Sequence, residues 1–166
     1  MIELVSADIT RIKADIIVLS ANPRLIRGGG VSGAIHKAAG PELELAAKAL
    51  GPFEPGNAVM TDAFNLQAKK VIHAVAPVFE EQKPNLDEVF LRTYQSVFAC
   101  NLETAPTQTI VFPAIGSGIY RWPPERAANL AVTALLSSPY LATLVAVIDE
   151  LNYRAYASAL NLKQIG

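Results

Sequence analysis

The chain has very few of the side chains that form disulfides or bind zinc. It holds one cysteine, Cys100, and two histidines, His36 and His73. A single cysteine cannot form an internal disulfide, which suits a reducing compartment, and we expect a cytoplasmic protein in which Cys100 packs as a small apolar side chain. One cysteine and two separated histidines also provide no zinc cluster. We therefore expect no metal and no other cofactor.

Long apolar runs and basic clusters are absent as well. No uninterrupted run approaches the ~20 residues of a membrane span, and the first residues lack the pattern of a signal peptide. The net charge is −1, and basic residues occur at most in adjacent pairs such as Lys69-Lys70. Binding to duplex nucleic acid needs many cations on one face, so neither a membrane nor nucleic acid is expected as a partner.

The composition that remains is typical of a globular protein. Of the 166 residues, 51% are hydrophobic and 17% are charged, and we expect one domain over residues 1–166, present as a monomer. Apolar runs alternate with segments of helical spacing, which predicts an α/β fold with a mixed, largely parallel sheet covered on both faces. The predicted strands are residues 2–6, 16–20, 57–62, 70–75, 109–112 and 141–148, and the predicted helices are residues 32–39, 41–50, 85–101, 123–137 and 151–160.

The stretch from 18 to 40 is the most informative. An apolar strand leads through three consecutive glycines into a predicted helix, which Ser32 is expected to cap. Glycines let the backbone approach a ligand closely, and the free N–H groups of a helix start suit an anion. Because Gly30 is followed by Val31-Ser32, the pattern is not a P-loop. It predicts a phosphate-binding loop, the alternative being a strand-to-helix turn without a ligand.

A second loop containing glycines, residues 113–120, also follows a predicted strand. In open α/β sheets, ligands bind beyond the carboxyl ends of the strands. We therefore expect the two loops to line one crevice.

Several short motifs, in the same order along the chain, resemble those of the macro domain family, which binds ADP-ribose. The resemblance covers nearly the whole chain and implies a three-layer α/β/α sandwich with ADP-ribose between the two glycine loops. The motifs are Ala7-Asp-Ile-Thr10, Asp15-Ile-Ile-Val18, Ala21-Asn22, Gly28-Gly-Gly-Val-Ser-Gly-Ala-Ile-His36, Gly56-Asn-Ala-Val59, Phe64-Asn-Leu66, Lys69-Lys-Val-Ile-His73 and Phe112-Pro-Ala-Ile-Gly-Ser-Gly-Ile-Tyr120.

The resemblance implies roles for individual residues. Asp8 would accept a hydrogen bond from the adenine amine while the Ile9 backbone reads the ring edge, and an Asx turn at Asp8 is a second role that can coexist. Backbone N–H groups of both loops would hold the diphosphate. Tyr120 would pack against the far ribose, or serve ordinary rim packing. The expected ligand contacts are Asp8, Ile9, Ala21, Asn22, Gly28, Gly29, Gly30, Val31, Ser32, Gly33, Ala114, Gly116, Ser117, Gly118, Ile119, Tyr120 and Ile148.

The candidate catalytic residues are Asn22, Ser32 and His36. The Asn22 amide can donate to and accept from the far-ribose hydroxyls and so orient the substrate, or it can shape a turn before Pro23. His36 lies one turn into the first predicted helix, where it would reach the far ribose or a water, or act as a structural histidine.

Three positions depart from the family pattern. Ser32 stands where the best-known hydrolase subgroup has an aspartate, and a hydroxyl is a poor base at neutral pH. Macro domains of the coronavirus type are similar here, since they carry a small residue and still remove ADP-ribose. Leu19 replaces an asparagine, and Ile148 replaces an aromatic residue that stacks on adenine. Next to it, Asp149 either caps the final helix or touches the ligand.

We therefore expect the chain to bind ADP-ribose and to hydrolyse an ADP-ribose linkage, by removing mono-ADP-ribose from protein. The alternatives are a reader that binds ADP-ribose without turnover, or a hydrolase of O-acetyl-ADP-ribose or ADP-ribose 1″-phosphate. The expected partner is ADP-ribose or an ADP-ribosylated protein.

Overall fold

The computed structural model describes residues 1–164, and within this range six strands form one sheet in the order β1-β6-β5-β2-β4-β3. Every neighbouring pair is parallel except β3 with β4, which is antiparallel at one edge of the sheet. This confirms the prediction of a mixed, largely parallel sheet. The strands are β1 (Ile2–Val5), β2 (Ile16–Ser20), β3 (Asn57–Asp62), β4 (Lys70–Val75), β5 (Thr109–Phe112) and β6 (Ala142–Ala146).

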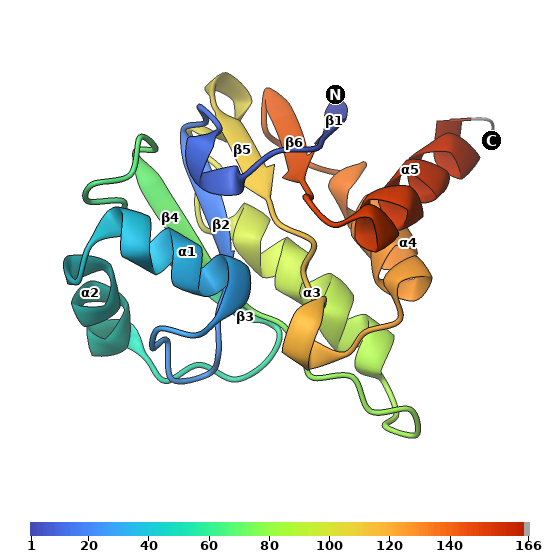
Figure 1. The fold of residues 1–166 in the computed structure, drawn as a ribbon, viewed down its shortest axis with the longest axis horizontal. Coiled ribbons are helices and arrows are strands. Elements are labelled where there is room, and N and C mark those ends of the chain that lie inside the picture. Colours follow the sequence, from blue (N-terminus) through green and yellow to red (C-terminus); the bar gives the residue numbers. More distant parts are fainter. Residues whose placement is uncertain (165–166) are drawn as a thin grey trace.

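Helices cover both faces of the sheet. Figure 1 shows α1 beside α2 on one side of the molecule and α4 beside α5 on the other. None of the helices within residues 1–164 is long and apolar enough to cross a membrane. The α-helices are α1 (Gly30–Ala39), α2 (Glu42–Leu50), α3 (Leu86–Ala99), α4 (Pro124–Leu135) and α5 (Glu150–Gln164), and the 3₁₀ helices are η1 (Ile9–Arg11), η2 (Ala105–Thr107) and η3 (Gly118–Tyr120).

Strand β2 is buried on both faces, which explains its unbroken apolar sequence. Its side chains alternate, so that Ile16 and Val18 join the core beneath α3, α4 and α5, while Ile17 and Leu19 join the core beneath α1 and α2. Leu19, one of the three departures from the family pattern, is therefore a core residue. Cys100 packs against the first of these cores, as expected, and burial raises the pKa of its thiol.

The start of α1 differs from the prediction. The helix begins at Gly30 rather than at Ser32, and Gly29 is its N-cap residue without a side-chain bond. The Gly33 N–H donates to the Gly29 carbonyl at 3.1 Å, which closes the first turn. Because glycine is itself an acceptable N-cap residue, the helix needs no hydroxyl there. The prediction that Ser32 caps the helix is wrong, and Ser32 lies within the first turn.

The end of β6 also differs from the prediction, which extended this strand to Ile148, but for another reason. The strand ends at Ala146, whose partner in the edge strand β1 is Val5, the last residue of that strand. One further bond joins the Val147 N–H to the Val5 carbonyl at 3.0 Å. The residues that follow lead into α5 instead of extending the strand to Ile148.

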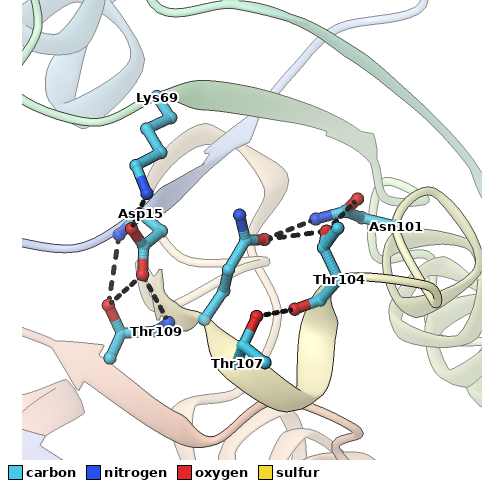
Figure 2. Close-up of polar contacts among 7 residues, drawn as sticks. Asp15, Lys69, Asn101, Thr104, Thr107 and Thr109 are labelled. Atoms are coloured by element: carbon cyan, nitrogen blue, oxygen red, sulfur yellow. Dashed lines mark hydrogen bonds and ion pairs between the residues drawn. The ribbon is translucent and has the colours of Figure 1, made fainter.

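A polar cluster ties the strands together at their amino ends (Figure 2). The Asp15 carboxylate accepts from the Thr109 backbone N–H at 2.9 Å and pairs with the Lys69 Nζ at 3.0 Å. The Thr109 N–H, followed by Lys69, holds the pKa of Asp15 below its ordinary value. Close by, Asn101 donates from its amide to the Gln108 side chain at 2.7 Å. This end of the sheet is thus joined by polar contacts, while the glycine loops leave from the opposite end.

The buried His73 of β4 predicts a stability that depends on pH. Its ring is 0% exposed and its Nε2 lies 2.9 Å from the Thr61 hydroxyl. Burial, with a smaller effect of His36, lowers its pKa to about 4 from the ordinary 6.5. Between these values the unfolded chain binds a proton that the folded chain does not, so the free energy of unfolding falls as pH drops from 6.5 to 4. The expected total is about 3 kcal/mol.

Urea unfolding of the wild type and of His73→Gln at pH 7 and pH 4.5 measures this effect. We expect the variant to lose most of the pH dependence and to keep a part from His36, whose pKa burial also lowers. The Asp8 and Asp15 carboxyls, with pKa values below the ordinary 3.8, titrate outside this window. Equal pH dependence in both proteins would contradict the assignment to His73.

Candidate active site

A cavity of about 510 Å³ opens at the carboxyl ends of β2, β5 and β6. These strands are neighbours in the sheet, so the segments that follow them meet around one opening. The volume lies in the range of small-molecule sites. The lining residues are Ser20 at the end of β2, Asn22 and Gly28–Ser32 after it, Pro113, Ala114 and Ser117–Tyr120 after β5, and Ala146, Val147, Asp149 and Asn152 around the end of β6.

Two helix starts face the cavity, one from each loop. The first N–H groups of a helix have no acceptor within it, and those of α1 belong to Gly30, Val31 and Ser32. In the second loop, η3 begins at Gly118. The N–H groups of Gly33 and Ser117, also expected to hold an anion, instead donate to the Gly29 and Ala114 carbonyls at 3.1 and 3.3 Å.

Two of the predicted glycine contacts serve packing and do not line the cavity. A Cβ at Gly33 would lie 2.7 Å from the Gly28 carbonyl oxygen, so glycine allows the loop to approach α1. Gly116 has φ +89°, and a Cβ there would lie 2.9 Å from the Trp122 ring. That ring is held in turn by its Nε1, which donates to the Pro77 carbonyl at 2.8 Å. Both glycines therefore shape the loops.

Asn22 closes the turn that leads into the glycine loop. Its Nδ2 donates to the Ile26 carbonyl at 2.8 Å, and its Oδ1 accepts from the Ile26 N–H at 3.3 Å. The turn-forming role weighed for Asn22 is therefore present. One N–H and one lone pair of the amide remain, and the residue lines the cavity. A role in substrate positioning thus stays compatible with the turn.

Tyr120 connects the second loop to the end of β2. Its hydroxyl donates to the carbonyl of Ala21 at 3.1 Å, and its side chain lines the cavity. Burial raises the pKa of Tyr120, so the hydroxyl stays protonated at neutral pH. Ala21 is buried and contributes this carbonyl, and it does not line the cavity.

A family model described as "Macro domain" matches residues 18–131, which is more than half of the chain and includes both loops. This chain belongs to the macro domain family. The "O-acetyl-ADP-ribose deacetylase" of Klebsiella pneumoniae is 41% identical to it over 160 residues, which cover 89% of each chain. A protein of the same name from Cronobacter turicensis is 44% identical over 135 residues, covering 78% of this chain and 76% of that one.

Solved structures confirm the predicted three-layer sandwich. A macrodomain mutant of Oceanobacillus iheyensis with ADPR has a TM-score of 0.91 at 28% identity, covering 99% of this chain and 94% of that one.

Asp8 of this macro domain forms the Asx turn considered for it. Its carboxylate accepts from the Thr10 hydroxyl at 2.7 Å and from the Thr10 N–H at 2.9 Å. These bonds, the hydroxyl first, lower the pKa of Asp8 and keep it ionised at neutral pH. Ile9 is 4% exposed and belongs to the core. Neither residue lines the cavity, although both follow β1, the neighbour of β6.

Asp149 has the first of the two roles weighed for it, that of a helix cap. Its Oδ1 accepts from the N–H and from the side-chain amide of Asn152, both at 2.9 Å, and so caps the start of α5. Both residues also line the cavity at its β6 end. Ile148, by contrast, is 68% exposed and does not line it.

His36 lies away from the cavity, in a groove where α1 meets α2. It is one helical turn beyond Ser32, about 6 Å farther along the axis. Its ring is 4% exposed, and burial lowers its pKa. This position gives no support to a contact between His36 and the far ribose, and it matches the structural alternative instead.

The charge around the cavity is sparse. Among the lining residues of the described chain, Asp149 is the only carboxylate, and no lysine or arginine is present. Ser32 lies at the β2 end, where none of the described lining residues is an acid. Within residues 1–164, no three His, Cys, Asp or Glu side chains are grouped to hold a metal ion.

Several residues that line the cavity were not predicted from the sequence. Ser20 and Pro113 could have been predicted, because Ser20 ends one predicted strand, Pro113 directly follows another, and both strand ends face the crevice. Asn152 could not have been predicted in this way, because it is bonded to Asp149 at the start of a helix and does not follow a predicted strand end. The other lining residues that were not predicted are Ala146 and Val147.

The two hydrogen bonds of Asn22 predict a measurable effect on stability. Asn22→Ala removes both bonds to Ile26, and we expect the free energy of unfolding to fall by about 1 to 2 kcal/mol. Urea unfolding checks this, with Asn161→Ala as the matched control, since Asn161 is exposed on α5. An effect no larger at Asn22 than at Asn161 would show that the turn does not depend on this amide.

Proposed function

We propose that this macro domain binds ADP-ribose in the cavity and hydrolyses O-acetyl-ADP-ribose to ADP-ribose and acetate. The observation that carries the proposal is one cavity, shared by three strand ends, that brings two helix starts together. The start of α1 can bind an anion through its N–H groups and the helix dipole, and the short η3 can add N–H groups, so a diphosphate can be held without lysine or arginine. The relatives named as O-acetyl-ADP-ribose deacetylases support the choice of substrate.

The ligand would span the cavity from β2 to β6. Strand β5 lies between these two strands, so the diphosphate would occupy the middle of the cavity, between the loops. The far ribose would then lie at Asn22 and Tyr120, and the adenosine at the end formed by Asp149 and Asn152. An adenine that extends past β6 toward β1 would meet Asp8, whose ionised carboxylate can accept from the amine.

The reaction would occur at the β2 end. Water adds to the acetyl carbonyl, the bond from the acetyl carbon to the ribose oxygen breaks, and that oxygen leaves with a proton. The free N–H and lone pair of Asn22 would position the ribose or the water, while backbone N–H groups would stabilise the developing negative charge. Since Ser32 provides no carboxylate, a phosphate oxygen of the substrate is the base that we propose.

The names of the relatives favour O-acetyl-ADP-ribose over the protein-linked ADP-ribose expected from the sequence. A second candidate function is a reader that binds ADP-ribose without turnover. Its support is the absence of an acid among the described residues that line the β2 end.

Replacing Ser32 by an acid tests both functions in one experiment. Release of ADP-ribose from O-acetyl-ADP-ribose is followed by mass spectrometry for the wild type, Ser32→Asp, Ser32→Asn and Asn22→Ala. We expect slow turnover by the wild type, a loss in Asn22→Ala, and a rise of kcat of about 10²-fold in Ser32→Asp, the lower end of what a positioned base contributes. Ser32→Asn matches the aspartate in shape without its charge and should give no rise.

Calorimetry with ADP-ribose and a parallel assay on a mono-ADP-ribosylated protein separate the alternatives. Binding without turnover of either substrate, in the wild type and in Ser32→Asp, would establish the reader and contradict the hydrolase. Faster release from protein than from O-acetyl-ADP-ribose would overturn the choice of substrate. An absence of ADP-ribose binding would overturn the proposal as a whole.

A further inference from the structure

A second cavity, which we call the α1–α2 groove, lies where these two helices meet. Its volume is about 400 Å³, and none of its lining residues lines the cavity at the strand ends. The groove combines cations with a small apolar surface. Its side chains include Arg27, His36, Lys37, Pro41, Glu44 and Leu45.

The cations of the α1–α2 groove are not neutralised. Within residues 1–164, neither Arg27 nor Lys37 takes part in an ion pair. Glu44, the one carboxylate among the described residues that line the groove, accepts from the Arg27 backbone N–H at 3.3 Å. The groove therefore carries two positive charges against one negative charge, in a chain whose net charge is −1.

His36 adds a polar group that is almost fully enclosed. Its ring is 4% exposed, and its Nδ1 is buried without a hydrogen-bond partner. Buried polar atoms are seldom left unpaired, so this nitrogen calls for an explanation. A bare lone pair costs less than an N–H without an acceptor, which places the proton of the neutral ring on Nε2. Nδ1 is enclosed while the residue lines the groove, so we infer that Nε2 is the ring nitrogen that faces a molecule there.

We propose that the α1–α2 groove binds the oxyanion of a small organic molecule, a carboxylate or a phosphate monoester. Arg27 and Lys37 would form ion pairs with it, and the His36 Nε2–H would donate a hydrogen bond. Pro41 and Leu45 would contact the apolar part of the same molecule. This site does not depend on ADP-ribose, and it gives the enclosed His36 a role separate from the reaction.

The two histidines of the chain provide the test. Spectra of ¹³C-labelled histidine rings are recorded while inorganic phosphate or sodium acetate is added, with sodium chloride at equal ionic strength as reference. Burial lowers the pKa of His36, Glu44 raises it, and Arg27 lowers it further. A bound anion favours the protonated ring, so we expect a saturable shift of the His36 signal and a rise of its pKa. The fully buried His73, whose pKa His36 lowers only as the smaller of two causes, is expected to shift less than His36.

Variants locate the effect. Lys37→Gln should weaken the response by about fivefold to tenfold, as expected for one charged hydrogen bond. Lys48→Gln, at an exposed lysine on α2 outside the groove, should leave it unchanged. A response to phosphate alone or to acetate alone supports the site and identifies which oxyanion it prefers. The proposal is overturned if chloride gives the same shift, if neither anion acts, or if Lys37→Gln responds like the wild type. These results are obtained without ADP-ribose, so they do not depend on the proposed function.

Discussion

The site depends on the burial of β2 between parallel neighbours. Its residues from Ile16 to Leu19 are at most 1% exposed, and it pairs with β4 on one edge and β5 on the other. A shift by one residue would exchange the side chains of the two cores, so the register is strongly specified. The strand therefore delivers Asn22 and the glycine loop to one defined place, next to the loop that follows β5.

The two ends of β2 have opposite characters. At its amino end, Asp15 joins Thr109 and Lys69 through a closed set of hydrogen bonds and an ion pair (Figure 2). At its carboxyl end, the loops leave the N–H groups of two helix starts without acceptors within their helices. Backbone groups are held by the fold itself and need no ordering when a ligand arrives. This is how a chain of net charge −1 can present an anion site with no cation among the described residues that line it.

Much of this arrangement could be predicted from local patterns. The alternation of apolar runs and helical segments predicted the sheet and its covering helices, because apolar strands must be buried on both faces. The glycine loops could be placed at one crevice because parallel strands end on the same side. The prediction that Ser32 caps α1 was wrong because Gly29 is the N-cap residue and has no side chain.

Other features depend on contacts between distant segments, which no local pattern reports. His36 lies in the groove where α1 meets α2. Its place one turn into the helix had instead suggested a contact with the far ribose or a water. Asn152 faces the cavity because it bonds to Asp149 after β6 has ended. The contacts of Asp8 with ligand remain a prediction, since the observed bonds of its carboxylate are to Thr10.

ADP-ribose is expected to bind across the two helix starts. A titration of ¹⁵N-labelled protein with ADP-ribose tests it most directly, because each backbone N–H reports on its own surroundings. We expect the largest shifts at Val31, Ser32, Gly118 and Ile119, with little change at Asp15 and Thr109 at the opposite end of the sheet. Shifts confined to Arg27, Lys37 and Glu44 of the α1–α2 groove, or no shifts at all, would contradict it.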